Sequence, residues 1–424
     1  LAHMDFWTPL VLGIAALVGA WRLQQLARRE GPTALGNFSL LGLAQLLLVW
    51  GAAWWGLALS SEVLRFLDPE WQAAALLGVA ALSVAAASLI APRARWPELA
   101  LLCCLLIPLA GVVLLQVWHL HYQPAAHFGW LGWALLFAVH FWSLRRLAAQ
   151  LPAGALSAAH VLGCWLLLGV LALELRYLFF ALSEHYNAWR WLGWALLPSA
   201  YLWLMSLPRQ WPWPLAAYPR EYRLLAAAPL ALLMLGWFWL ANVASAGDAE
   251  PLAYLPLLNP LELGLLFALG AVFAWARVGL VELGVDAMRS QWLTQALAGA
   301  SLFALLTAMV MRTAHHWGGV PYQLDALLDS MLVQAGLSIV WTLIALPLMV
   351  LGNRRGRREL WLIGAALIAV VVAKLLFVEL GNRGGLERIV SFIGVGVLLL
   401  VVGYFAPLPP RKAEAEVEQV RESV

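Results

Sequence analysis

Long apolar segments recur along this chain, separated by polar breaks of only a few residues, and this pattern limits the folds open to it. Each segment has the roughly 20 residues that an α-helix needs to cross about 30 Å of hydrocarbon. Backbone groups in lipid must bond within their own segment, so we predict helices rather than membrane strands, which alternate apolar and polar residues over shorter runs. About thirteen spans are expected, near residues 6–23, 38–59, 71–91, 99–118, 128–147, 155–181, 188–206, 224–245, 261–280, 291–311, 329–351, 360–379 and 389–406.

The composition supports this all-α, polytopic transmembrane bundle over residues 1–406. Of the 424 residues, 63% are hydrophobic and 12% are charged, whereas a soluble domain typically carries about a quarter charged residues. A net charge of +3 without a basic surface pattern gives no reason to expect nucleic acid as a partner. The three cysteines lie inside predicted helices and form neither a disulfide framework nor a zinc motif. Membrane lipids are the expected surroundings, and no cofactor is predicted.

Positive charge alternates between the two ends of the predicted helices. Cytoplasmic loops collect Arg and Lys. The basic breaks contain Arg22/Arg28/Arg29, Arg93/Arg95, Arg145/Arg146, Arg209/Arg220/Arg223, Arg354/Arg355/Arg357/Arg358 and Arg411/Lys412. The breaks between them are acidic or neutral, and loop 277–289 is balanced. The pattern predicts an N-terminus outside, a cytoplasmic C-terminus and a disordered or briefly helical cytoplasmic tail over 407–424.

Tryptophan follows the same two sides. The chain has 25 tryptophans, many near predicted helix ends, as expected for an interfacial aromatic belt. For the outer set, sugar stacking is the functional alternative. That set comprises Trp7, Trp71, Trp118, Trp130, Trp189 and Trp317.

Histidine gathers toward the predicted outer side. His119-x-His121 and the His315-His316 pair are the two groupings with metal-like chemistry, because neutral imidazole is a common transition-metal ligand. No established metal motif fixes their geometry. We therefore predict no metal site, with His119 and His121 as weak candidates, and regard interfacial loop histidines without a ligand as the simpler interpretation.

Charged residues inside the predicted spans are more informative, because each costs several kcal/mol unless it is paired or hydrated. They gather at similar depth in the predicted outer half. The charged members, inside the spans or at their ends, are Glu174, Arg176, Arg312, Asp325, Asp329, Lys374, Glu379 and Arg388, and the uncharged polar residues Gln334 and Ser391 lie beside them.

Two interpretations of this set remain open. The first is a group of interhelical ion pairs, for instance Lys374 with Asp329 or Glu174. The second is a polar cavity open to the outside. In that cavity, His315, His316, Asp325 and Asp329 would be the catalytic candidates, and the remaining residues would bind substrate, with Arg176, Arg312 and Arg388 holding phosphate.

The last third of the chain resembles one bacterial family. The segments that carry the resemblance are Gln334-Ala-Gly-Leu-Ser-Ile-Val-Trp341, Arg358-Glu-Leu-Trp361, Val372-Ala-Lys374-Leu-Leu-Phe-Val-Glu379-Leu, Glu387-Arg388-Ile-Val-Ser391-Phe392-Ile-Gly-Val-Gly396 and Gly403-Tyr-Phe-Ala-Pro-Leu-Pro-Pro410. They are similar to the polytopic inner-membrane family called domain of unknown function 2339, specifically over 315–410 and upstream only in hydropathy.

The resemblance implies a multi-pass protein of the bacterial inner membrane and no established activity. Members are usually longer, so we expect this chain to be a C-terminal portion. The start Leu1-Ala2-His3-Met4 resembles a cloning remnant. Lys374, Arg388, Ser391 and His315-His316-Trp317 lie in the family-like segment, in agreement with the cost of buried charge.

Three functions are compatible with the sequence. The first is an outward-facing site that binds or modifies an envelope substrate, such as a lipid-linked sugar, another glycan or a lipid headgroup. The second is a transporter or flippase, which usually binds near the midplane with broken helices. The third is a scaffold for an envelope-assembly system, whose protein partners the sequence does not identify. A pocket that opens to the outside and is closed toward the cytoplasm favours the binding or modifying site. A pocket that reaches past the midplane of the membrane favours a transporter or flippase.

Overall fold

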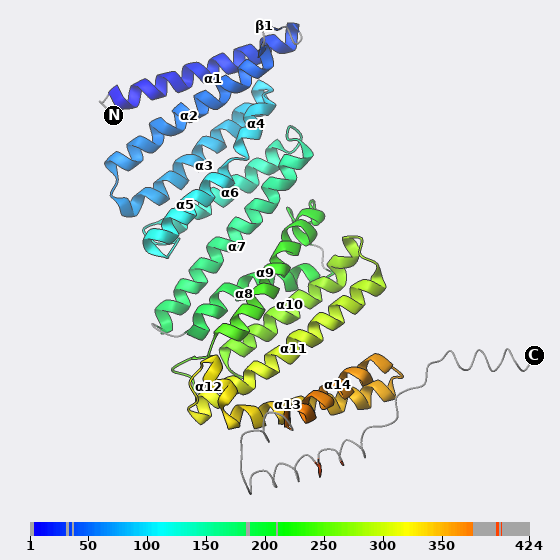
Figure 1. Ribbon diagram of the computed structural model, residues 1–424. Helices are drawn as coiled ribbons and strands as arrows, with labels where there is room; N and C mark the ends of the chain where they lie inside the picture. The colour runs from blue at the N-terminus through cyan, green and yellow to red at the C-terminus, as the bar shows by residue number, and fades with distance from the viewer. Residues whose placement is uncertain are drawn as a thin grey trace, which may run out of the picture. The chain divides into compact units, whose positions relative to one another are not determined.

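The computed structural model describes residues 4–30, 34–35, 38–183, 187–208 and 211–375, together with 396, 397 and 400. These residues are almost entirely helical (Figure 1). Every predicted span up to 360–379 overlaps a described helix. The last predicted span, 389–406, and the predicted tail, 407–424, fall outside the description apart from three isolated residues.

Among the described residues, 9 helices are long and apolar enough to cross a membrane. Three further predicted spans are helical without belonging to this set: α6 (Gly129–Leu147), α8 (Asn187–Ser206) and α14 (Arg358–Lys374). Helix α14 is described over only 17 residues, and α8 is rich in tryptophan, which is less hydrophobic than the aliphatic side chains. The protein is therefore an all-α, multi-pass bundle.

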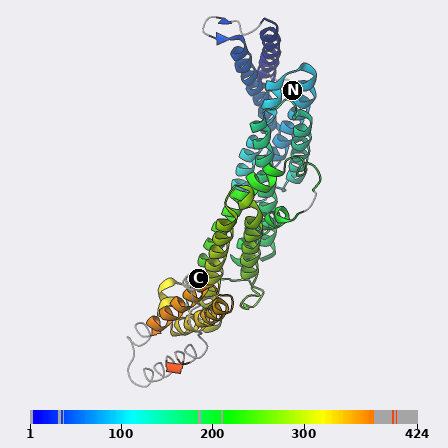
Figure 2. The same cartoon turned by 90° about the vertical axis from the view of Figure 1, so that its right-hand side faces the viewer.

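The chain divides into two compact units, and the first contains residues 1–238 and 266–294. Its complete helices are α1 (Met4–Glu30), α2 (Leu40–Phe66), α3 (Pro69–Ala94), α4 (Pro97–Cys103), α5 (Leu106–His121), α6, α7 (Ala153–Ser183), α8 and the π-helical turn η1 (Glu221–Ala226). The two-residue strands β1 (Ala34–Leu35) and β2 (Phe38–Ser39) pair antiparallel between α1 and α2 (Figure 2).

Glycine sets the close packing of α1 on α2. A Cβ atom at Gly51 would lie 2.9 Å from the backbone nitrogen of Leu17 and 3.0 Å from the carbonyl oxygen of Gly13. Small residues let two backbones approach closely, which is how helices associate where lipid is as apolar as leucine. The sequence therefore specifies this helix pair through small residues rather than large ones.

The core of the first unit also buries two histidines from predicted spans. His140 on α6 lies with Nε2 3.2 Å from the carbonyl oxygen of Ala159, and His160 on α7 lies with Nδ1 2.9 Å from the hydroxyl of Tyr222. Neither side chain reaches the surface. Both interactions link neighbouring helical segments, so these histidines contribute to packing.

The second unit contains residues 239–265 and 295–424. The unit boundaries fall inside α9 (Ala227–Ala244), α10 (Pro260–Glu282) and α11 (Ala287–Gly318). The short helix α12 (Leu324–Asp329), then α13 (Met331–Arg354) and α14 follow. Buried Leu327 on α12 belongs to one apolar cluster with Ala314 on α11 and Val333 on α13. This cluster fixes α12 at the end of α11 and the start of α13.

Helices α13 and α14 form a hairpin whose glycines allow close contact. A Cβ atom at Gly364 would lie 2.8 Å from the carbonyl oxygen of Ala345. Gly356, with φ +65°, reverses the chain between the two helices. The basic turn formed by 354–358 therefore lies at the opposite end of α13 from α12.

Candidate functional site

A buried ion pair lies where α11 meets the start of α10, within the second unit. Arg312 Nε is 3.1 Å from Glu262 Oε1, and both side chains are 0% exposed. Glu262 belongs to the first turn of α10, where the positive end of the helix dipole favours a carboxylate. Burying two charges is costly unless their remaining polar atoms are also bonded, so the surrounding contacts decide whether the pair is stable.

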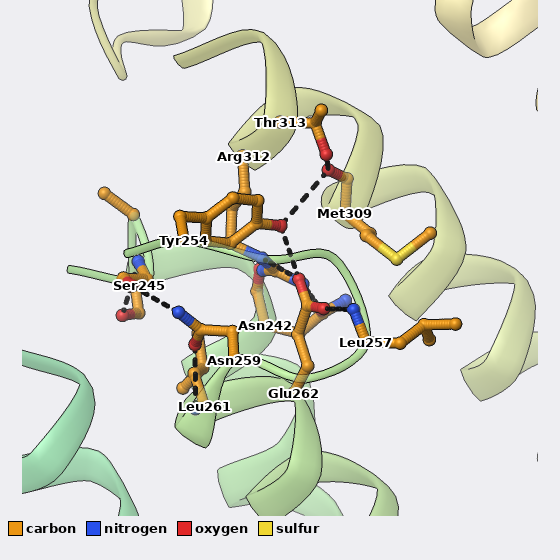
Figure 3. Close-up of polar contacts among 12 residues, drawn as sticks. Asn242, Ser245, Tyr254, Leu257, Asn259, Leu261, Glu262, Met309, Arg312 and Thr313 are labelled. Atoms are coloured by element: carbon orange, nitrogen blue, oxygen red, sulfur yellow. Dashed lines mark hydrogen bonds and ion pairs between the residues drawn. The ribbon is translucent and has the colours of Figure 1, made fainter. Parts of the chain in front are cut away.

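Those remaining polar atoms are bonded by three neighbours (Figure 3). Arg312 donates from Nη1 to the carbonyl oxygen of Asn242 at 2.9 Å and from Nη2 to Oδ1 of the same residue at 3.2 Å. Tyr254 donates its hydroxyl proton to Glu262 Oε1 at 2.6 Å, and the backbone N–H of Leu257 donates to Oε2. The two charges therefore join α9, α10, α11 and the segment between α9 and α10.

Burial and the adjacent Glu262 carboxylate raise the pKa of Tyr254 above the usual range of a phenol. The hydroxyl consequently stays protonated at neutral pH and keeps donating to the carboxylate. Tyr254 is 6% exposed and belongs to the connecting segment, outside the candidate spans. It thus ties this segment to the buried ion pair.

Asn259 shapes the rest of the segment that connects α9 to α10. Its Oδ1 accepts the backbone N–H of Leu261 at 2.9 Å, and Pro260 occupies the first helical position. An Asn cap followed by Pro is a strong helix-start signal. Its Nδ2 donates to the carbonyl oxygen of Gly247 at 2.9 Å, and Gly247 adopts φ +82°. The segment is thereby fixed against the last turns of α11 and presents Asp248 beside the helix.

Asp248, His315 and His316 lie close together and are each partly exposed, and we call them the surface cluster. His316 stacks on Tyr254, with ring centroids 4.5 Å apart and an interplanar angle of 13°. Its Nε2 lies 2.9 Å from the carbonyl oxygen of Ala246 and 3.7 Å from Asp248 Oδ1. His315 lies with Nδ1 2.6 Å from the carbonyl oxygen of Val320. Candidate ligand atoms of Asp248, His315 and His316 all lie within 4.8 Å of one another.

The predicted site residues of this unit occupy different positions. His315 and His316 belong to the surface cluster, whereas Arg312 lies beneath it with its guanidinium enclosed. Asp325 and Asp329 are exposed on α12. In the described part of the chain, the carboxylate that the structure brings to the histidines is Asp248.

Lys374 and Gln334 lie on the α13–α14 hairpin. Lys374 Nζ donates to the carbonyl oxygen of Gln334 at 2.6 Å and to the hydroxyl of Ser338 at 2.7 Å. The side chain of Gln334 donates to the carbonyl oxygen of Leu328 at 2.6 Å. The predicted residues Glu379, Arg388 and Ser391 fall outside the described residues.

The other candidates belong to the first unit. Glu174 accepts the backbone N–H of Ala125, and Arg176 lies over the ring of Trp194 at 5.4 Å. His119 is exposed near the end of α5, and the side chain of the neighbouring His121 is not described. The described contacts of Glu174 and Arg176 are with residues of the same unit.

Sequence reasoning missed five residues of this arrangement: Asn242, Asp248, Tyr254, Asn259 and Glu262. A signal existed for Glu262, which is a charged residue inside the predicted span 261–280, and for Asn242 inside the span 224–245. Asp248 lies in the acidic break between the predicted spans 224–245 and 261–280 and was not a predicted site residue. Its approach to His316 depends on the folding of residues 245–259, which hydropathy does not specify.

The helices and their hydropathy define a polytopic membrane protein. The chain belongs to the family described as "Predicted membrane protein (DUF2339)", whose family-wide pattern matches residues 3–409. The match extends well upstream of the 315–410 segment that carried the resemblance and covers nearly the whole chain. No curated protein and no solved structure matches it.

Proposed function

We propose that this protein is a multi-pass protein of a bacterial inner membrane that binds or modifies the polar headgroup of an envelope lipid at its periplasmic face. The headgroup would be that of a phospholipid or a lipid-linked sugar. The observation that carries the proposal is the meeting of Asp248, His315 and His316 at a partly exposed surface, above a fully bonded and buried Arg312–Glu262 pair.

The charge pattern supports the periplasmic side. The surface cluster lies at the end of α11 near α12 and the start of α13, whereas the basic turn formed by 354–358 lies at the other end of α13. Short basic loops stay in the cytoplasm. This pattern supports a cluster on the opposite, periplasmic side of the membrane.

The neighbouring apolar residues support a lipid rather than a water-soluble solute. Trp317 is 64% exposed while its Nε1 donates to the carbonyl oxygen of Tyr254 at 3.1 Å. Leu252, Leu255 and Leu258 in the connecting segment are also exposed. Tryptophan with one bonded polar edge suits the membrane–water boundary. A lipid there would place its acyl chains against these side chains and its headgroup near the histidines.

The polar groups supply acid–base chemistry at the same place. Asp248 Oδ1 is 3.7 Å from His316 Nε2, so a carboxylate and an imidazole lie side by side at this surface. An imidazole can take up a proton from, or give one to, a headgroup hydroxyl near neutral pH. The stacking of His316 on Tyr254 holds the ring in place for this role.

The test is lipid retention by the full-length protein after purification from bacterial membranes. Native mass spectrometry should detect bound lipid in the wild type and severalfold less in Asp248→Asn and His316→Gln. His119→Gln, which changes an exposed histidine of the first unit, is the matched control and should retain lipid normally. Equal lipid retention by all four proteins would contradict the proposal. Transbilayer movement of a fluorescent phospholipid in proteoliposomes that requires His316 would instead favour a flippase.

A further inference from the structure

We propose that Asp248, His315 and His316 form a binding site for a divalent transition-metal ion of the zinc class. Two imidazoles and one carboxylate are the donor set of many zinc sites with an open coordination position. The three residues come from two segments, the end of α11 and the segment after α9, and all are partly buried. The site thus joins donors that are more than sixty residues apart in the sequence.

The hydrogen bonds of the two histidines leave one ring nitrogen of each free to bind a metal. A carbonyl oxygen only accepts, so the ring nitrogen facing it must carry the proton. His315 therefore donates from Nδ1 to Val320, and His316 from Nε2 to Ala246. His315 Nε2 and His316 Nδ1 are then unprotonated. Metal-binding histidines usually donate their other ring nitrogen to a carbonyl or carboxylate in this way, which fixes the ring and its tautomer.

Hydrogen bonds and ring stacking hold the residues beneath the site, and the three ligand side chains can still approach a bound ion. Tyr254 bonds to Glu262 and stacks on His316, and the Asn259–Gly247 hydrogen bond holds the residue before Asp248. Tetrahedral zinc with bonds of about 2.0–2.1 Å separates its ligand atoms by about 3.3 Å. The candidate ligand atoms lie within 4.8 Å of one another, so closure requires movements of about an ångström. Asp248 Oδ1 lies 3.7 Å from His316 Nε2, so the carboxylate must also turn toward the side of the ring that carries Nδ1. The Asp248 side chain is 45% exposed, so it can make such a movement.

A metal ion at this position would make the proposed lipid site more specific. The inference rests on the proposed function only where it identifies the fourth ligand of the ion as part of a lipid headgroup. Three protein donors leave one coordination position for water or for an anionic oxygen. A phosphate oxygen of a lipid headgroup is an anionic oxygen of this kind, as are the carboxylate oxygens that serve as zinc ligands. The metal would therefore select phosphorylated headgroups over neutral ones.

The test is metal binding by the full-length protein after chelator treatment in detergent. Titration with Zn²⁺, followed by elemental analysis, should show one ion per chain, and Co²⁺ should give the visible absorption of a tetrahedral site. Asp248→Asn and His315→Gln should weaken zinc binding at least 10-fold, in the range found when groups at a metal site are altered. Asp325→Asn and His119→Gln, which change exposed residues elsewhere, should bind like the wild type.

Two results would overturn the metal site. One is the absence of stoichiometric Zn²⁺ binding by the wild-type protein. This result does not depend on the folding of any variant. The other is zinc binding that survives in the Asp248 and His315 variants or disappears in His119→Gln. Lipid retention measured on the same metal-free and zinc-loaded samples separates the two proposals. If lipid retention depends on His316 but not on zinc, the result supports the headgroup site and contradicts the metal site.

Discussion

Arg312 and Glu262 are fifty residues apart in the sequence and form an ion pair of 3.1 Å in which neither side chain is exposed. The hydrogen bonds of this pair with Asn242, Tyr254 and Leu257 lead to α9 and to the segment between α9 and α10. The pair therefore does more than neutralise a charge within α11. It determines where residues 245–259 lie and, through them, where Asp248 meets the histidines.

Removing one partner of this pair should destabilise the protein strongly. Glu262→Leu leaves a buried guanidinium that cannot lose its proton, and breaking a buried pair in this way costs about 3–5 kcal/mol. Arg312→Leu should cost less, because the remaining carboxyl group can take up a proton. Thermal unfolding of the purified protein in detergent measures both. The double variant should lose less stability than the two single losses added together.

The matched control for this prediction is the partly exposed pair Arg223–Glu282, with a distance of 3.5 Å. Glu282→Leu should change stability by about 0–1 kcal/mol, as is typical of exposed ion pairs. If Glu262→Leu and Glu282→Leu melt at the same temperature, the buried pair is not the anchor described above.

Gly247 should tolerate no side chain. Its φ of +82° is unfavourable for other residues, and a Cβ atom would lie 3.1 Å from Arg312 Cδ. Gly319 has a φ of +67°, but a Cβ atom there would meet no other atom within 4 Å. Gly319→Ala should therefore show only the backbone cost of about 1–2 kcal/mol. Gly247→Ala should melt lower still, because it also displaces the arginine. Equal melting temperatures would exclude this contact as a constraint.

The helices of this arrangement and its buried arginine could be predicted from the sequence for physical reasons. Hydropathy specifies which segments are helical, because a span must satisfy its own backbone in lipid. The cost of burying charge also singled out Arg312 before any partner was known. That argument identifies a residue that needs a partner, but it does not identify the partner.

The rest depends on a loop that no periodic pattern describes. Glu262 reaches Arg312 because Asn259 and Pro260 start α10 where they do, and Asp248 approaches His316 because Gly247 adopts a positive φ. Asp325 and Asp329 were predicted candidates because they belong to the charged residues that gather at similar depth in the predicted outer half. The structure places them exposed on α12, while the nearby carboxylate comes from the preceding loop.

Lys374 should stabilise the α13–α14 hairpin. Its ammonium donates to the carbonyl oxygen of Gln334 and to the hydroxyl of Ser338, and hydrogen bonds from charged groups contribute about 1.5–3 kcal/mol. Lys374→Met should lower the melting temperature more than Ser338→Ala, which removes one of the two acceptors of Lys374 and the hydrogen bond that the hydroxyl donates to the carbonyl oxygen of Gln334. A fully stable Lys374→Met variant that loses lipid retention would instead indicate a direct role in substrate binding.

The orientation can be tested with two cysteines at opposite ends of α13. Asp325 and Arg357 are both exposed, and the native Cys103, Cys104 and Cys164 can first be replaced by alanine. A membrane-impermeant maleimide should label Asp325→Cys in intact cells with a permeabilised outer membrane. It should label Arg357→Cys only after lysis, because the basic turn is expected in the cytoplasm. The reverse labelling would show that the proposed site faces the cytoplasm rather than the periplasm. Because Leu327 packs in one cluster with Ala314, the label on α12 also reports the side on which His315 and His316 lie.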